Sequence, residues 1–213
     1  MKVTAIVATG VKNGNTNKIC EAILKGAKDN GHKTELINLS DFTISPCTGC
    51  FKCADDKPCS IKDDFHKIYR TCAESDVIIL GSPVYFGNIS GLMKNFFDRH
   101  NGNAMFNPAE MADLPSVPKN KRLKTFMKNI SKRYRPLDEI TGKKVIRVVT
   151  SNKPYFLLKL SGELRTTLDA MNRYISELKC ARFGTIVYPG TIFNPEKRDK
   201  ILTKAYAMGK KIR

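Results

Sequence analysis

A strand, a polar loop and a helix follow one another in VTAIVATGVKNGNTNKICEAIL, residues 3–24. Residues 3–8 form an apolar, β-branched run, which predicts a strand buried on both faces. Glycine and small polar residues fill positions 9–16, where Asn15 or Thr16 can cap the helix that follows. The apolar residues of this helix recur at helical spacing. The stretch therefore predicts a strand–loop–helix unit at the start of the chain.

The same alternation continues along the chain. Further strands are expected at residues 34–39, 76–80, 145–150 and 183–188, and further helices near residue 63 and at about 90–99, 162–178 and 196–212. Strands that alternate with helices predict parallel βαβ units. We therefore expect an α/β protein of one domain, residues 1–213, with a doubly wound sheet of five parallel strands.

Residues 101–141 interrupt this alternation, after the helix that follows the third strand. They hold three prolines before a basic stretch and then a short helix, expected at about 122–133. A connection of this length is usually functional or mobile. We treat it as a basic insertion, because residues 119–135 carry eight basic residues and no acidic one.

The net charge of +17 is concentrated in the second half of the chain. Residues 1–100 carry 13 Lys/Arg and 11 Asp/Glu, whereas residues 101–213 carry 24 and 9. Such a field attracts nucleic acid, anionic membranes or acidic proteins, although a solvated surface is the plainer interpretation. The basic stretch lacks the interleaved aromatic residues of a single-strand binder.

The chain shows no targeting or membrane segment in its first residues. MKVTAIVATG is too short to span a bilayer and lacks a signal-peptide cleavage pattern. We therefore expect a soluble, cytoplasmic protein that makes no membrane contact. Seven cysteines in such a protein favour metal or redox chemistry over structural disulfides.

Four of the seven cysteines lie in Cys47-Thr-Gly-Cys50-Phe-Lys-Cys53-Ala-Asp-Asp-Lys-Pro-Cys59. The two-residue gaps bring three sulfurs to one side of a tight turn, and the fourth returns after five residues. Four converging thiolates can hold an iron–sulfur cluster or a tetrahedral zinc, and thiol redox chemistry is a third interpretation. The spacing is closer to ferredoxin-type ligation than to paired zinc ligands. Cys20, Cys72 and Cys180 are expected to pack in the core.

Ligands of a doubly wound sheet bind beyond the carboxyl ends of the strands, where the strand order reverses. Residues 9–16 offer hydroxyls, backbone N–H groups and a helix N-terminus that suit a phosphate, without a Walker or GxGxxG pattern. Residues 81–91 offer Tyr85 and Phe86 to a planar heterocycle, unless these rings pack into the core. A phosphate cradle and an aromatic loop at one edge fit flavin mononucleotide (FMN).

These residues resemble a known family. VATGVKNGNTNKI, residues 7–19, looks like the phosphate loop of the flavodoxin-like NAD(P)H-dependent FMN reductases, whose usual pattern is GSPRxxGNT. GSPVYFGNISGLMKNFFDR, residues 81–99, is similar to their flavin-loop-plus-helix signature. CTGCFKCADDKPCSIKDDF, residues 47–65, is similar to the iron–sulfur flavoprotein branch, whose cysteine motif holds a 4Fe–4S cluster. The resemblance covers residues 1–100 well and residues 140–190 loosely.

The resemblance implies a flavodoxin-like fold and a set of site residues. The expected FMN contacts are Thr9, Val11, Asn13, Asn15, Thr16, Ser82, Pro83, Val84, Tyr85, Phe86, Gly87, Thr150 and Ser151. The expected ligands of a 4Fe–4S cluster are Cys47, Cys50, Cys53 and Cys59. Gly10-Val11 replaces the family's Pro-Arg, and Ser151-Asn-Lys-Pro-Tyr155 replaces its glycine-rich segment. These departures affect the expected binding of NADPH or NADH more than the expected binding of FMN.

We therefore expect an FMN-dependent oxidoreductase that passes electrons between a one-electron carrier such as ferredoxin and a small-molecule acceptor. No side chain needs to act as a catalytic base, and an acidic carrier would dock on the basic half of the chain. The resemblance also implies a homodimer or homotetramer. One alternative is an NAD(P)H-dependent FMN, quinone or nitro reductase without a cluster. A nucleic-acid-binding module is disfavoured because no reader motif accompanies the charge.

Overall fold

The computed structural model describes residues 1–50, 52–53, 58–100, 114–133 and 140–213, with the backbone alone at 114 and 128–133. Five parallel strands form the sheet in the order β2-β1-β3-β5-β6. They are β1 (Lys2–Val7), β2 (Lys33–Asn38), β3 (Val77–Tyr85), β5 (Lys144–Thr150) and β6 (Ala181–Tyr188). This is the flavodoxin-like order, which reverses between β1 and β3. The predicted doubly wound α/β class is confirmed.

The prediction of five strands is wrong in one respect, because the described residues include a sixth strand. β4 (Asn88–Ile89) runs antiparallel to the end of β3 and places Asn88 opposite Tyr85. Two residues are too few to show the alternation of polar and apolar residues by which strands are predicted.

Strand β3 is also longer than predicted. Its pairing with β1 ends at Gly81, but its pairing with β5 continues until Pro83 lies opposite Thr150. Pro83 lacks an N–H group, and it is tolerated because β1 no longer pairs with β3 at this level. Residues 81–85, which were expected in a loop, are thus held by the sheet.

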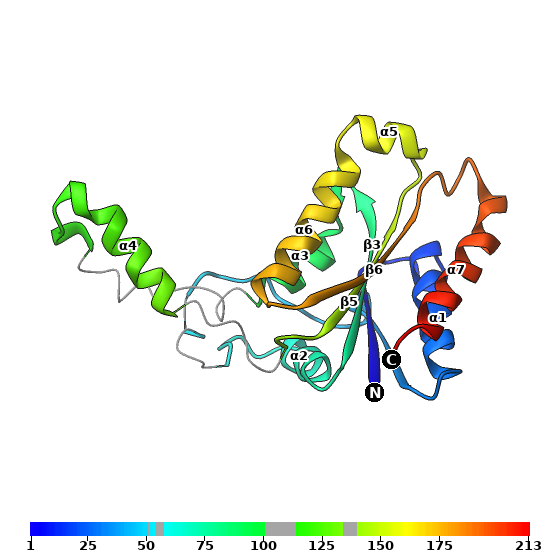
Figure 1. Cartoon of the computed structure of the whole chain (residues 1–213), viewed down its shortest axis with the longest axis horizontal. Helices are drawn as coiled ribbons and strands as arrows, with labels where there is room; N and C mark the ends of the chain where they lie inside the picture. The colour runs from blue at the N-terminus through cyan, green and yellow to red at the C-terminus, as the bar shows by residue number, and fades with distance from the viewer. Residues whose placement is uncertain (51, 54–57, 101–113, 134–139) are drawn as a thin grey trace.

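Helices cover both faces of the sheet (Figure 1). One face is covered by α1 (Asn15–Lys28) and α7 (Arg198–Lys210). The other is covered by α2 (Phe65–Ala73), α3 (Gly91–Asp98) and α6 (Glu163–Glu177). A short α5 (Tyr155–Leu160) follows β5, and 3-10 turns lie at Leu39–Asp41, Leu114–Ser116 and Pro195–Lys197. The strands therefore lie between two apolar layers, as expected for parallel strands.

Two glycines allow the terminal helix to lie directly against α1. A Cβ atom on Gly26 would lie 2.1 Å from the carbonyl oxygen of Tyr206, and one on Gly209 would lie 2.0 Å from that of Ile23. Both distances are far below van der Waals contact, so a side chain at either position would push the two backbones apart. The C-terminal helix is therefore fixed to the N-terminal unit of the fold.

Two helices differ from the prediction. α4 (Lys119–Arg133) begins three residues earlier than expected, because the N–H groups of Lys121 and Arg122 donate to the carbonyl of Pro118. α5 was not predicted, since its apolar residues stand side by side in YFLLKL instead of recurring periodically. The remainder of the basic insertion, at 101–113 and 134–139, lies outside the described residues. In the part that is described, no helix is both long and apolar enough to span a bilayer.

Candidate functional site

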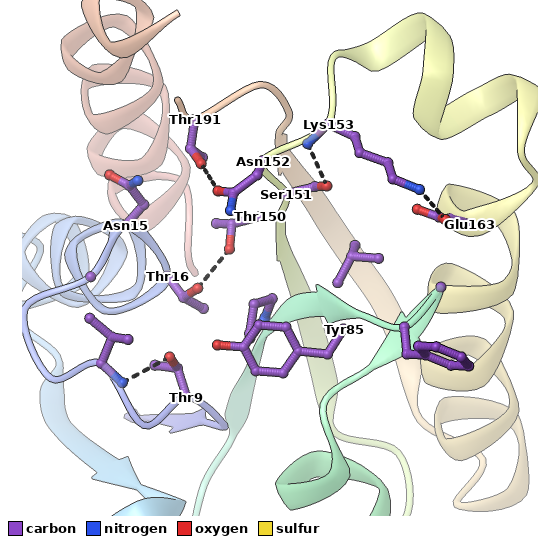
Figure 2. Close-up of a pocket in the computed structure, with 16 residues that line it drawn as sticks. Thr9, Asn15, Thr16, Tyr85, Thr150, Ser151, Asn152, Lys153, Glu163 and Thr191 are labelled. Atoms are coloured by element: carbon purple, nitrogen blue, oxygen red, sulfur yellow. Dashed lines mark hydrogen bonds and ion pairs between the residues drawn. The ribbon is translucent and has the colours of Figure 1, made fainter. Parts of the chain in front are cut away.

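A pocket of about 740 Å³ opens at the carboxyl edge of the sheet (Figure 2). Its volume is within the usual range for cofactor sites. The lining residues lie in the last residues of β3 and β5, in the loops that follow β1, β3, β5 and β6, or at the starts of α1 and α6. They are Thr9, Val11, Gly14, Asn15, Thr16, Pro83, Val84, Tyr85, Phe86, Gly87, Thr150, Ser151, Asn152, Lys153, Glu163 and Thr191. The pocket thus occupies the place where the strand order reverses, between β1 and β3.

All the expected FMN contacts line this pocket except Asn13 and Ser82. Asn13 is exposed on the loop after β1. Ser82 is buried, and its hydroxyl donates to the Pro83 carbonyl at 2.9 Å and accepts from Ser90 N at 2.9 Å. Ser82 therefore faces away from the pocket and holds the start of α3, because β3 is still a regular strand at this residue.

Five lining residues were not among the expected FMN contacts, although Gly14 lies in the predicted phosphate loop: Gly14, Asn152, Lys153, Glu163 and Thr191. Asn152 and Lys153 directly follow the expected contacts Thr150 and Ser151 and belong to the same segment, residues 150–153, which was expected at the ligand site. Thr191 follows β6, and the rule that ligands bind beyond strand ends could have indicated it. Glu163 begins α6, and no feature of the sequence pointed to it.

The N-terminus of α1 opens into the pocket. Gly14 is its N-cap residue and no side chain caps it, so the predicted capping by Asn15 or Thr16 is wrong. The first N–H groups of a helix carry a partial positive charge and bind anions when no side chain occupies them. A Cβ atom on Gly14 would lie 3.0 Å from the carbonyl oxygen of Val11, which favours glycine at this turn.

Three buried threonines surround this helix end. The hydroxyls of Thr16 and Thr150 lie 2.7 Å apart and join the loops after β1 and β5. The hydroxyl of Thr9 accepts from Val11 N at 3.2 Å. Each hydroxyl can reorient to donate to an incoming anion. The arrangement suits a phosphate held by neutral donors.

The cation that lines the pocket is already paired. Lys153 forms an ion pair with Glu163 at the pocket's edge, as Figure 2 shows. Its neighbour Asn152 accepts a 2.6 Å hydrogen bond from the Thr191 hydroxyl, which fixes the loop after β5 to the loop after β6. The helix dipole and the threonines are thus the main sources of attraction for a phosphate.

The opposite side of the pocket is aromatic. Tyr85 is half exposed and Phe86 is fully exposed, so the alternative that both rings pack in the core is wrong. Phe86 and Gly87 have φ angles of 48° and 80° in the turn between β3 and β4. In Figure 2 the Tyr85 phenol points toward the side of the pocket formed by Thr9 and Thr16. These rings offer a planar heterocycle an apolar surface.

The four clustered cysteines lie elsewhere, between β2 and α2. All seven cysteines are free thiols, and the predicted core packing is confirmed for Cys20 and Cys72, which are buried; Cys180 is half-buried. Cys47 and Cys50 are exposed, whereas Cys53 and Cys59 are half-buried. Among the residues with described positions, no three His, Cys, Asp or Glu side chains are grouped to hold a metal ion. The predicted convergence of four sulfurs is therefore not seen.

The clustered thiols nonetheless affect one another's ionisation. Burial raises the pKa of Cys53, and the negative charges of Cys59, Cys47 and Cys50 raise it further, so the four groups act on one another. The backbone N–H of Lys52, aided by neighbouring hydroxyls, lowers the pKa of Cys50. Four thiols on one loop that form no disulfide match the donor set of an iron–sulfur cluster, as they match that of a structural zinc.

A buried ion pair lies at the base of this cysteine loop, residues 47–59. The Arg99 guanidinium donates to both carboxylate oxygens of Asp63, at 2.6 and 3.2 Å, and both side chains are almost completely buried. Burial alone would raise the pKa of Asp63, but the bonds from Arg99 and from two backbone N–H groups lower it. Arg99 was not predicted as a site residue.

Arg99 also contacts the loop itself. Its Nη2 lies 3.4 Å from the Cys59 sulfur, and its Nη1 donates to the Ser45 carbonyl at 2.9 Å. The guanidinium stacks over the Phe65 ring at 4.7 Å. One side chain therefore touches residues that precede and follow the cysteines.

Comparison with known proteins identifies the relatives of this chain. The model of the NADPH-dependent FMN reductase family matches residues 1–112. An iron-sulfur flavoprotein of Archaeoglobus fulgidus is 41% identical over 99 residues, which are 46% of this chain and 48% of the relative. One from Methanocaldococcus jannaschii is 40% identical over 99 residues, 46% of this chain and 51% of the relative. The chain spans about half the length of the curated relatives it matches.

Solved structures show the same fold. An NAD(P)H:quinone oxidoreductase from Methanothermobacter marburgensis superposes with a TM-score of 0.71 at 15% identity, over 99% of this chain and 96% of the other. At this identity the likeness concerns the fold alone. The family model, in contrast, matches more than half of the 213 residues and includes the loops after β1 and β3. The chain belongs to the NADPH-dependent FMN reductase family.

Proposed function

We propose that the protein is an FMN-dependent electron-transfer oxidoreductase. The observation that carries this proposal is the pocket, which joins an uncapped helix N-terminus, three threonine hydroxyls and two exposed aromatic rings at the switch point of the sheet. Family membership supports the same cofactor. Bound FMN would supply the redox chemistry, and the protein would supply binding and orientation.

Each side of the pocket has a distinct role in this proposal. The N-terminus of α1, with Thr9, Thr16 and Thr150, holds the phosphate by neutral hydrogen bonds. Tyr85 and Phe86 lie against the flavin ring and exclude water from it. No side chain acts as a general base, because the residues only bind and orient the cofactor.

Titration of the flavin-free protein tests this assignment. FMN should bind at least about tenfold more tightly than riboflavin, because only FMN carries the phosphate that the N-terminus of α1 attracts. Flavin fluorescence measures both affinities. Asn13→Ala is the matched control, since Asn13 lies on the same loop but outside the pocket, and it should leave both affinities unchanged. Equal affinities for the two flavins would contradict the phosphate site.

We propose further that Cys47, Cys50, Cys53 and Cys59 ligate a 4Fe–4S cluster. The donor set supports this, as do the iron-sulfur flavoprotein names of the relatives. Such a cluster transfers single electrons, which a two-electron flavin can collect. The pair would connect a one-electron carrier such as ferredoxin with a small-molecule acceptor.

A second candidate is an NAD(P)H-dependent FMN, quinone or nitro reductase in which the cysteines stay thiols. The dispersed sulfurs of the described loop residues favour this candidate. Anaerobic reduction separates the two. Reduced ferredoxin should bleach the flavin rapidly if the first is right, whereas NADPH or NADH should do so without ferredoxin if the second is right.

The basic half of the chain would bind an acidic carrier. Residues 119–133 form α4, which contains seven Lys/Arg and no acidic residue and stands apart from the sheet in Figure 1. Electron delivery should slow steeply as the salt concentration rises. Lys121→Gln with Lys124→Gln should weaken this dependence, whereas Lys25→Gln on α1 should not. Salt-independent rates would contradict docking by charge.

The pocket mouth also supports a homodimer or homotetramer. Exposed apolar side chains lie beside pocket residues on α5 and after β6: Tyr155, Phe156, Leu160, Ile192 and Phe193. Groups of exposed apolar side chains are usual at protein interfaces. Light scattering should give a multiple of the 23.9 kDa chain mass, and Leu160→Glu should reduce it. A monomeric wild-type protein would exclude this assembly.

A further inference from the structure

Helix α3 connects the pocket to the cysteine loop. Its N-cap residue Ser90 donates through its hydroxyl to the Ala8 carbonyl at 2.7 Å and accepts from Met93 N at 3.3 Å. Ser90 N donates to Ser82 in β3. The start of the helix is thus fixed to β1 and β3, the strands that lead into the pocket. Its 8 residues span about 12 Å before Arg99 follows as the C-cap residue.

Arg99 brings the two ends of the cysteine loop together at the other end of this helix. It donates to the carbonyl of Ser45, before the first cysteine, and to that of Ile61 at 3.4 Å, after the last. On the same helix Asn95 donates to the Ile44 carbonyl at 2.5 Å, which reinforces the first of these contacts. The loop therefore begins and ends at the last turn of α3.

The free-energy cost of burying the Arg99 charge favours keeping Arg99, Asp63 and both ends of the cysteine loop in contact. A buried guanidinium is tolerated only when a carboxylate neutralises it and hydrogen bonds satisfy its donors. Asp63 provides the charge, and two loop carbonyls provide acceptors. The buried Nε of Arg99 already lacks a hydrogen-bond partner among the described residues. Displacing either end of the loop would remove a further acceptor from this buried charge, which is costly.

The contact between Arg99 and Cys59 also bears on the charge of the Cys59 sulfur. An N–H donor next to a thiolate stabilises its negative charge. Donors to the sulfur ligands of a cluster shift its reduction potential, since they favour the more negative, reduced state. Of the four clustered sulfurs, Cys59 is the one that Arg99 reaches, at 3.4 Å.

We propose that Arg99 is a positioning residue that fixes Cys59 and both ends of the cysteine loop to the helix whose other end carries the flavin loop. The effect on a reduction potential rests on the proposed cluster, whereas the attachment of the loop does not. Arg99 thereby sets the position of the one-electron site relative to the flavin pocket.

Hydrogen exchange in the cluster-free protein tests the attachment. The double variant Arg99→Met with Asp63→Asn removes both charges and avoids an unpaired carboxylate. Amides in residues 42–47 and 58–65 should exchange roughly tenfold faster, while those in 7–16 and 80–90 stay unchanged. The single variant Arg99→Lys should keep part of the wild-type protection from exchange, because lysine retains the charge but lacks the bidentate geometry. Lys94→Met, at an exposed position of α3, is the control and should change nothing.

Redox titration of the cluster-loaded protein tests the positioning role of Arg99, because substituting a purely structural residue would not change the reduction potential. The potential should become more negative in Arg99→Met and return partly in Arg99→Lys, with FMN affinity unchanged in both. Unchanged exchange rates at the loop ends, or a potential unaffected by Arg99→Met, would overturn the proposal. A wild-type protein that binds no iron would contradict the proposed cluster, and the exchange rates would then decide the attachment alone.

Discussion

The flavin pocket and the cysteine loop are positioned by different parts of the structure. Backbone pairing within the sheet places the pocket residues, as where Pro83 lies opposite Thr150. The cysteine loop lies outside the sheet, and the side chain of Arg99 contacts both of its ends. The pocket therefore follows from the topology of the fold, whereas the cysteine loop depends on one buried ion pair. The two sites should respond separately to mutation.

The largest expected effect of this separation is the loss of iron without the loss of flavin. Cys50→Ser should reduce the iron content of anaerobically purified protein to background, because a cluster of this type needs four thiolates. The FMN content should not change, since Cys50 is not among the pocket residues. Cys180→Ser, outside the loop, should retain both. Loss of FMN together with iron would show that the two regions are not independent.

Acid should act on the cysteine-loop end of α3. His100, next to Arg99, is fully buried, and burial lowers its pKa to about 4. Its Nδ1–H donates to the Phe96 carbonyl at 2.8 Å, and the Tyr174 hydroxyl lies 3.3 Å from its Nε2. In the unfolded chain a histidine takes up a proton below about pH 6.5. The free energy of unfolding should therefore fall as the pH drops from about 6.5 to 4.

Urea unfolding at pH 7.5 and pH 5 measures this dependence, and about 2 kcal/mol should be lost between them through His100. His100→Phe cannot titrate and should flatten this part of the pH profile, even if it lowers stability at every pH. An unchanged slope in this variant would assign the acid sensitivity to other groups. No histidine lines the pocket, so no lining imidazole changes its charge over this range.

A smaller effect is expected inside the pocket. Thr16→Val keeps the shape of a buried side chain but removes the hydroxyl that lies 2.7 Å from Thr150. FMN affinity should fall about tenfold, because a hydrogen bond to a charged phosphate is lost. Riboflavin affinity and iron content should stay the same. Thr203→Val on α7 serves as the control. If Thr16→Val weakened riboflavin binding as much as FMN binding, Thr16 would not contact the phosphate.

The smallest effect concerns the ion pair at the pocket's edge. Glu163→Gln leaves the Lys153 cation without its carboxylate partner. FMN affinity should rise about two- to threefold and become more sensitive to salt, as expected for a partly exposed charge. Lys153→Gln, which removes the cation, should not show this increase. Weaker FMN binding by Glu163→Gln would mean that the carboxylate itself contacts the ligand.

Much of the pocket could be predicted from the sequence, because local patterns place Thr9 and Thr16 after β1 and Thr150 at the end of β5, two strands of one sheet. Ser82 was misplaced because β3 continues beyond residue 80 through its pairing with β5, which is a long-range effect. The role of Arg99 could not be predicted. It depends on contacts with Ser45 and Asp63, which lie 54 and 36 residues away in the chain, and no local pattern encodes them.

The central claim is that one chain carries a flavin pocket and a separate iron–sulfur site. Counting FMN, iron and acid-labile sulfide in one sample of anaerobically purified wild-type protein tests it most directly. The account predicts about one FMN, four iron atoms and four sulfides per chain, with broad brown absorbance. A yellow protein that contains FMN but no iron or sulfide would contradict it.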